Sequence, residues 1–267
     1  MSTRNKNFAI GVFDSGLGGL TVVKELIRQL PDEDIVYFGD TARVPYGTKS
    51  KESVVRFSKE NAAFLLTQRV KMIVVACNTS SSLAMSMLRK HFTVPIVSVI
   101  TPGAQKAVAV SQNKRIGVIA TPATINSQSY TKSLKKFERS VIVSAQACPL
   151  FVPLVEEGWH DGEITTDIVR KYLGEMKKSG MDTLILGCTH YPLLKVVIQK
   201  VVGPRVQLID SAQEVALEVK RILERKEMRR VRKGKGHYSF WVSDEPKHFR
   251  RLAKRFLGFD IKNVKRA

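Results

Sequence analysis

The stretch Val74-Val75-Ala76-Cys77-Asn78-Thr79 decides the fold, together with its counterpart Leu184-Ile185-Leu186-Gly187-Cys188-Thr189-His190. Each is a short apolar run, rich in branched residues, that ends in a cysteine followed by small polar residues. Such a run is too short for a helix and is typical of a buried strand in a parallel sheet. Because α/β folds bind ligands at the carboxyl ends of these strands, we expect both thiols in a ligand site. A helix beginning after each cysteine is expected to lower the thiol pKa.

The order of predicted elements repeats in two halves of the chain. The distance from the first strand residue to the cysteine is 69 residues in one half, Phe8 to Cys77, and 72 in the other, Ile116 to Cys188. This alternation of apolar runs and amphipathic segments predicts the α/β fold class. We expect two similarly wound α/β lobes with mainly parallel sheets, and an active site in the cleft between the lobes.

The predicted lobes are discontinuous in sequence. The first comprises residues 1–99 plus 211–267, and the second comprises residues 100–210. The last strand and helix of the chain are expected to return and complete the first lobe. Further expectations are one helix over residues 80–91, one over 126–137, an irregular loop over 148–158 and a helix over 192–202.

Length and composition are those of a soluble globular protein. The 267 residues are 43% hydrophobic and 25% charged, which suffices for one large or two ordinary domains. The first residues lead directly into an apolar strand without a signal-peptide pattern, and no apolar run approaches ~18 residues. Three cysteines are an odd number for a disulfide framework. We therefore expect a cytoplasmic protein with no membrane contact.

The charge of the chain is strongly positive and unevenly distributed. The net charge is +20, and residues 220–267 contribute +12 of it through 17 Lys and Arg against 5 Asp and Glu. A basic segment of this kind can contact nucleic acid or form a solvated surface. It contains neither a zinc-ligand spacing nor a recognisable RNA-binding signature. A nucleic-acid partner is therefore an alternative to a plain basic surface.

A glycine-rich turn follows the first apolar strand. Asp14-Ser15-Gly16-Leu17-Gly18-Gly19 lies between that strand and an amphipathic helix, where glycines let the backbone approach a ligand closely. Its spacing is neither the dinucleotide fingerprint nor that of a phosphate-binding loop. The turn therefore favours a ligand other than a nucleotide.

Four interpretations of the cysteines are compatible with their surroundings. They can simply pack in the core, and we expect this of Cys148, which lies beside Pro149 in an apolar segment. A metal site would need more ligands than His190 near Cys188, and a redox pair would need the usual Cys-x-x-Cys spacing. A single nucleophile with a histidine base would leave the second thiol unexplained.

Two equivalent thiols are explained by chemistry on both faces of one carbon atom. A thiolate on one face removes a proton while a thiol on the other face returns a proton, which inverts the stereocentre. The reverse reaction exchanges these roles. The two thiols must therefore be chemically alike but separately assisted.

Four separate motifs resemble those of glutamate racemase, in the aspartate/glutamate racemase family. They are FDSGLGGLT (residues 13–21), DTARVPYG (40–47), ACNT (76–79) and GCTHYP (187–192), and the match extends from about residue 8 to 225. The resemblance implies a cofactor-independent enzyme without a metal that interconverts L-glutamate and D-glutamate by a two-thiol mechanism. It also implies that the D-glutamate supplies bacterial peptidoglycan synthesis.

The resemblance implies the site residues as well. Cys77 and Cys188 would be the two acid/base groups, with Asp14 assisting Cys77 and His190 assisting Cys188. The substrate would be bound by residues of these motifs and of two further loops: Asp14, Ser15, Tyr46, Gly47, Asn78, Thr79, Thr121, Glu156, Thr189 and His190. Amide and hydroxyl donors in such turns would stabilise developing negative charge in the absence of pyridoxal phosphate.

Two alternative functions and an expected assembly complete the prediction. An aspartate racemase would use the same two-thiol chemistry on a shorter acid. A racemase could also have an additional nucleic-acid-binding role through its basic C-terminal segment. Glutamate is the expected small-molecule partner, and a homodimer is the expected assembly.

Overall fold

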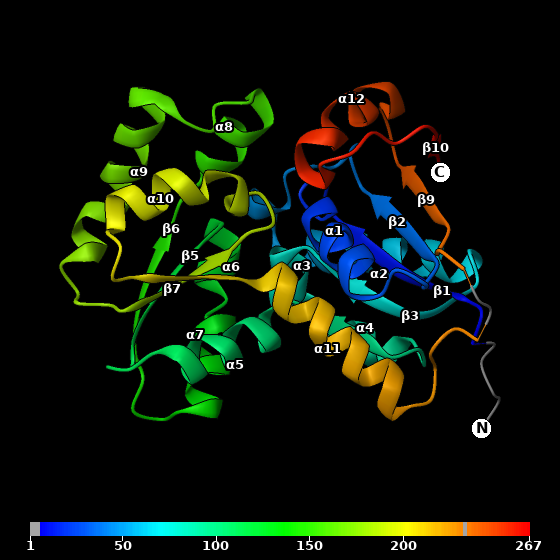
Figure 1. The fold of residues 1–267 in the computed structure, drawn as a ribbon, viewed down its shortest axis with the longest axis horizontal. Helices are drawn as coiled ribbons and strands as arrows, with labels where there is room; N and C mark the ends of the chain where they lie inside the picture. Colours follow the sequence, from blue (N-terminus) through cyan, green and yellow to red (C-terminus); the bar gives the residue numbers. More distant parts are fainter. Residues whose placement is uncertain (1–5, 232–233) are drawn as a thin grey trace.

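The computed structural model describes residues 6–231 and 234–267, and within these ranges the strands form two sheets whose strand pairs are all parallel (Figure 1). The strand order is β10-β9-β2-β1-β3-β4 in the first sheet and β6-β5-β7-β8 in the second. Each sheet is covered by helices, so the molecule has two α/β lobes. The predicted fold class is therefore confirmed.

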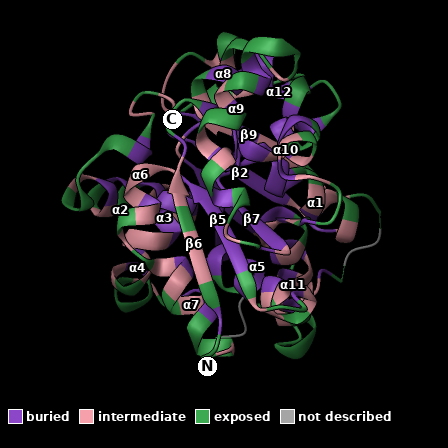
Figure 2. Cartoon of the chain, turned by 90° about the vertical axis from the view of Figure 1, so that its left-hand side faces the viewer, coloured by how far each residue is buried: buried purple, intermediate pink, exposed green. Residues whose placement is uncertain are grey.

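The strands are short, and most are apolar. Those of the first sheet are β1 (Ala9–Asp14), β2 (Ile35–Gly39), β3 (Val70–Val75), β4 (Ile96–Ser98), β9 (Tyr238–Val242) and β10 (Val264–Arg266). Those of the second sheet are β5 (Arg115–Ala120), β6 (Ile142–Ala147), β7 (Thr183–Gly187) and β8 (Gln207–Asp210). In Figure 2 the central strands β5 and β7 are mostly buried, whereas the edge strand β6 is partly exposed. Strands buried on both faces explain the continuous apolar runs in the sequence.

The helices of the chain alternate with the strands. Those that accompany the first sheet are α1 (Leu20–Gln29), α2 (Lys51–Thr67), α3 (Asn78–Leu83), α4 (Met85–His91) and α12 (Pro246–Leu257), with a 3-10 turn, η1 (Tyr46–Thr48). Those that accompany the second are α5 (Ile100–Val110), α6 (Pro122–Asn126), α7 (Ser129–Phe137), α8 (Phe151–Glu157), α9 (Gly162–Lys177) and α10 (Lys195–Val202), with a 3-10 turn, η2 (Tyr191–Leu194). Helix α11 (Ser211–Arg225) leaves the second lobe and packs against both α1 and α5.

The basic C-terminal segment is part of the first lobe. Strand β9 pairs with β2, and β10 pairs with β9, so the segment extends the first sheet. Two of its arginines bind the turn after α1. The Arg229 guanidinium donates to both carboxylate oxygens of Asp32 at 2.8 Å, and the Arg230 backbone N–H donates to Glu33 at 2.9 Å. At least one positive charge of the C-terminal segment, that of Arg229, therefore forms an ion pair within the first lobe.

Four predicted boundaries are wrong. The segment 148–158, expected to be a loop, contains α8. Pro153 does not prevent this helix, because it lies in the first turn, where its missing N–H costs no hydrogen bond. The single helix expected over 80–91 is interrupted at Ala84, and the one over 126–137 begins only after Gln128, whose backbone is left-handed (φ 55°). The helix expected over 192–202 begins as the turn η2.

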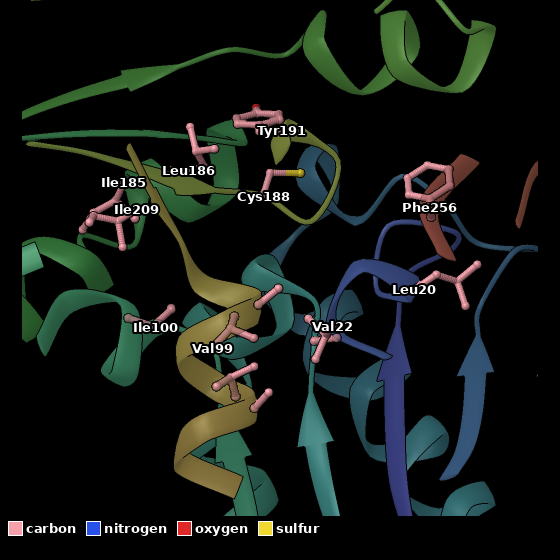
Figure 3. Close-up of a cluster of buried hydrophobic side chains, with 14 of the residues drawn as sticks. Leu20, Val22, Val99, Ile100, Ile185, Leu186, Cys188, Tyr191, Ile209 and Phe256 are labelled. Atoms are coloured by element: carbon pink, nitrogen blue, oxygen red, sulfur yellow. The ribbon is translucent and has the colours of Figure 1, made fainter. Parts of the chain in front are cut away.

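A continuous apolar core joins the two lobes. Figure 3 shows side chains of this core from α1, α5, β7 and α12, among them Leu20, Leu186 and Phe256, together with Cys188. Within residues 6–231 and 234–267, no helix combines the length and the apolar character needed to cross a membrane.

Candidate active site

Both predicted thiols line one cavity between the lobes. Cys77 follows β3 of the first sheet and Cys188 follows β7 of the second, so each stands at the carboxyl end of a central strand. The cavity encloses about 30 Å³, which holds only a few water molecules. Its walls are formed by Ser15, Val44, Pro45, Tyr46, Gly47, Cys77, Asn78, Thr79, Thr121, Val152, Cys188, Thr189 and His190. This is the place in the fold where a ligand can contact both thiols.

Cys77 caps the start of α3 but remains a weak acid. Its Sγ accepts a hydrogen bond from the Ser80 backbone N–H at 3.4 Å, as an N-cap side chain does. Burial and the negative charge of Asp14 nevertheless raise its pKa to about 12, against the lowering effect of hydrogen bonds from Ser80 and Ser15. The Ser80 N–H at the helix start lowers this pKa as expected, but burial of Cys77, which is 4% exposed, outweighs it, so the net shift is opposite to the prediction.

Cys188 is assisted by a side chain and not by a helix start. The turn η2 follows it, and His190 Nδ1 lies 3.9 Å from its Sγ. The other ring nitrogen, Nε2, lies 3.1 Å from Glu156 Oε1. Burial disfavours a charged ring, but the contacts to Cys188 and Glu156 raise the His190 pKa to about 10. The protonated form of His190 is therefore favoured where the ring lies between Cys188 and Glu156.

Asp14 lies beneath the cavity, at the end of β1. It is fully buried, and burial raises its pKa, while the positive charge of His190 and the backbone N–H groups of the glycine turn lower it. Its Oδ2 accepts from the Gly16 backbone N–H at 3.0 Å, and its Oδ1 lies 3.5 Å from the Thr189 hydroxyl of the other lobe. Asp14 therefore acts on Cys77 through its charge and links the two lobes.

Three further predicted residues meet across the cleft. The Thr79 and Thr121 hydroxyls are 3.0 Å apart, one from each lobe. Gly47 lies so close to Thr121 that a Cβ atom at Gly47 would be 2.6 Å from the Thr121 Cβ. These small side chains let the lobes approach closely around the cavity.

A buried hydroxyl relay sets the orientation of Asn78. The Tyr130 hydroxyl of α7 donates to Asn78 Oδ1 at 2.7 Å, and it lies 3.2 Å from the Ser211 hydroxyl at the start of α11. With its oxygen occupied by Tyr130, the Asn78 side chain keeps its NH2 group as a free donor. Tyr130 carries no local signal of this role, since it is 52 residues from Asn78 along the chain.

Tyr46 has a structural role in the first lobe. It lines the cavity, but its hydroxyl donates to buried Asp40 and accepts from Asn61 Nδ2 at 3.0 Å. The hydroxyl is engaged within the first lobe, and the predicted contact of Tyr46 with a substrate stays a prediction. The side chain fixes the loop that carries Gly47.

Glu156 lies outside the wall of the small cavity and lines a second cavity of about 310 Å³ beside it. The two cavities share Val44, Pro45, Gly47, Thr121 and Val152. Val44, Pro45 and Val152 were not predicted as site residues, because apolar side chains in loops carry no chemical signature. Cys148, expected to be a packing residue, is fully buried, and burial raises its pKa. In the described part of the chain, no three His, Cys, Asp or Glu side chains form a group that could hold a metal ion.

Comparison with known proteins gives a consistent result. The family model described as Asp/Glu/Hydantoin racemase matches residues 10–219. A glutamate racemase from Geobacter metallireducens is 52% identical over 256 residues, which are 96% of this chain and 95% of the relative.

Solved structures agree over nearly the whole chain. A glutamate racemase isoform from Bacillus anthracis has a TM-score of 0.95 at 40% identity and covers 98% of both chains. A glutamate racemase from Francisella tularensis in complex with D-glutamate has a TM-score of 0.92 at 39% identity, again over 98% of both chains.

Proposed function

The chain belongs to the Asp/Glu/Hydantoin racemase family and, within it, to the glutamate racemases, and from that premise we propose that it interconverts L-glutamate and D-glutamate with Cys77 and Cys188 as the acid/base pair. One observation carries the proposal: two thiols from the central strands of different lobes line the same small cavity. A single thiol, or two thiols in separate interiors, would not reach both faces of one carbon atom. The relatives named above are glutamate racemases, which favours glutamate over aspartate.

The chemical step moves one proton off the substrate and another onto it. The thiolate on one face takes the α-proton, so that the C–H bond breaks and an S–H bond forms. The thiol on the opposite face then gives its proton to the carbanion, and its S–H bond becomes a C–H bond. After one turnover the two sulfurs have exchanged protonation states, and the reverse reaction starts from the exchanged state.

The two thiols have different neighbours. His190, held by Glu156 at 3.1 Å, lies beside Cys188, whereas burial and Asp14 raise the pKa of Cys77 to about 12, which favours the protonated form of that thiol. In the two-thiol scheme Cys77 therefore starts as the acid and Cys188 as the base. Once Cys77 has lost its proton, its high pKa makes it a strong base for the reverse direction.

Neutral donors support the developing charge. Ser15, Asn78, Thr79, Thr121 and Thr189 place hydroxyl and amide groups around the cavity, and such preorganised donors stabilise a carbanion with its charge on the carboxylate.

The proposal also includes the lobe boundaries, the biological role, the location and the assembly of the protein. The lobe division at residues 99/100 and 210/211 is supported by the strand content of the two sheets. Use of D-glutamate in peptidoglycan synthesis follows from the activity, as the resemblance implies. Cytoplasmic location and a homodimer stay predictions, which fractionation and light scattering can test.

The direct experiment is circular dichroism of L-glutamate incubated with the purified protein and no added cofactor. The signal should decay to zero as the mixture becomes racemic, and L-aspartate measured in parallel should change far more slowly. A faster change with aspartate would reject glutamate as the substrate.

The mechanism is tested with Cys77→Ser and Cys188→Ser. Each should abolish most racemisation in both directions, because each direction needs both sulfurs, and Cys148→Ser serves as the matched control. Racemisation at the wild-type rate by either site variant would disprove the two-thiol scheme.

A further inference from the structure

The C-terminal helix of the first lobe contacts the acid/base group of the second lobe. Helix α12 and helix α8 face each other at the top of the molecule in Figure 1. The ring of Phe256, on α12, meets the ring of His190 edge to face, with centroids 5.6 Å apart and planes at 86°. Both residues are 2% exposed. Figure 3 shows Phe256 on the side to which the Cys188 sulfur points.

The neighbouring residue on α12 holds the end of α8. Arg255 Nη1 donates to the Glu156 carbonyl oxygen at 3.3 Å. It also packs on Gly158, which ends α8 in a left-handed conformation (φ 86°), and a Cβ atom there would lie 2.9 Å from Arg255 Nη1. The helix end that Arg255 contacts therefore carries the carboxylate that binds His190 Nε2.

These contacts fix the rotation of the His190 ring. Its Nδ1 faces Cys188 and its Nε2 faces Glu156, so the ring must keep an orientation in which both nitrogens reach their partners. The edge-to-face contact with Phe256 sets the plane of the ring and excludes water from it. By contrast, the groups that act on the pKa of Cys77 are Asp14, Ser80 and Ser15, which come from its own lobe.

We propose that Phe256 and Arg255 are positioning residues for the second acid/base centre: Phe256 fixes the plane of His190, and Arg255 fixes the end of α8 that carries Glu156. This inference rests on the proposed two-thiol function. It gives the basic C-terminal segment a role in proton transfer at Cys188, whereas Cys77 is assisted without it.

The first test is Phe256→Leu, which keeps an apolar side chain in the core but removes the ring. The kcat/KM value should fall about tenfold, a part of the ~10²–10⁴ that general acid/base catalysis supplies. The fall must be equal for both enantiomers, because the equilibrium constant of a racemisation is one. The rate alone therefore cannot identify the affected thiol.

Isotope effects identify it. We expect the primary deuterium effect on kcat/KM, measured with α-deuterated L-glutamate and D-glutamate, to move in opposite directions in Phe256→Leu. It should rise for the enantiomer that Cys188 deprotonates, because that step becomes more rate-limiting, and fall toward unity for the other enantiomer. A merely less stable enzyme would lose rate with neither isotope effect altered, since inactive molecules do not contribute to the effect.

Matched controls lie on the same helix. Phe249→Leu removes a buried ring that contacts Tyr37 in the first lobe and not His190, so both isotope effects should stay at wild-type values. Arg255→Gln should produce the same opposite shifts at smaller size, whereas Arg251→Gln, whose side chain contacts His248, should produce none.

A refutation of the positioning role can be distinguished from a refutation of the racemase function. Isotope effects that stay unchanged in Phe256→Leu, or that move in the same direction for both enantiomers, would refute the positioning role while leaving the racemase assignment intact. A wild-type protein that does not racemise glutamate would instead refute the assignment from which the positioning role is derived.

Discussion

The contact between the glycine turn and the second lobe can be tested by adding one methyl group. A Cβ atom at Gly18 would lie 2.2 Å from Thr189 Oγ1 and 2.6 Å from His190 Nδ1. Both atoms belong to buried side chains of the opposite lobe. The Gly18→Ala methyl can therefore be accommodated only if the lobes separate or His190 leaves its place beside Cys188.

The size of the effect follows from the overlap. Ordinary contacts of a Cβ atom are 3.4 Å or longer, so Gly18→Ala displaces the facing groups by about 1 Å, and a misplacement of that size can cost ~10²-fold in rate. That loss corresponds to ~2.7 kcal/mol of transition-state stabilisation. Gly18 is not among the glycines with a left-handed backbone, so alanine is compatible with its conformation. The loss should therefore be much larger in catalysis than in stability.

The assay is racemisation followed by circular dichroism, together with urea denaturation of the same preparation. Gly174→Ala is the control, because nothing lies within 4 Å of the added methyl at this position near the C-terminal end of α9. It should leave kcat/KM unchanged and raise stability by up to ~1 kcal/mol. If Gly18→Ala retains the wild-type kcat/KM, the close contact between the lobes has no catalytic importance and the reasoning is wrong.

Three further predictions concern polar groups elsewhere in the two lobes. Lys71→Met leaves buried Glu33 without its ammonium partner and should lower the unfolding free energy by ~3 kcal/mol in urea denaturation, with kcat/KM unchanged. Burial alone would raise the pKa of Asp182, but its hydrogen bonds lower that pKa below 3.8. The ionised carboxylate therefore stabilises the folded state fully above pH 3.8, and this stabilisation is lost as pH falls through the folded-state pKa. The difference in unfolding free energy between wild type and Asp182→Asn should shrink from about pH 6 to about pH 3, and a constant difference would contradict this. Tyr130→Phe removes the donor to Asn78 Oδ1 and should raise KM ~2- to 10-fold, the equivalent of one hydrogen bond, in initial-rate measurements; an unchanged KM would show that Asn78 needs no such support.

The sequence was sufficient for the parts of the molecule that depend on local pattern. A strand buried on both faces requires a continuous apolar run, so β3 and β7 could be located to within about two residues, and the thiols with them. Parallel strands also fix which of their ends meet in a ligand site, which is why Cys77 and Cys188 could be expected near each other.

The sequence was not sufficient where tertiary contacts decide. The sequence predicts a loop over 148–158 because Pro149 and Pro153 are typical of loops, although proline is compatible with a first helical turn. Neither Tyr130 nor Phe256 carries a local sign of its role, since each reaches the site from a distant part of the chain. The raised pKa of Cys77 is not predictable locally for a similar reason: burial depends on the tertiary fold and outweighs the helix start that the sequence reveals.

The two thiols are equivalent in sequence position but not in their electrostatic environment, and this difference has a mechanistic meaning. A symmetric pair, both thiols protonated or both ionised, would have to gain or lose a proton before reaction could start. Here the imidazole of His190, held by Glu156, lies beside Cys188, while burial and Asp14 raise the pKa of Cys77 to about 12. The fold thereby gives nearly identical strand ends unlike surroundings, a histidine beside one sulfur and a buried carboxylate near the other, so that the pair is not symmetric before the reaction starts.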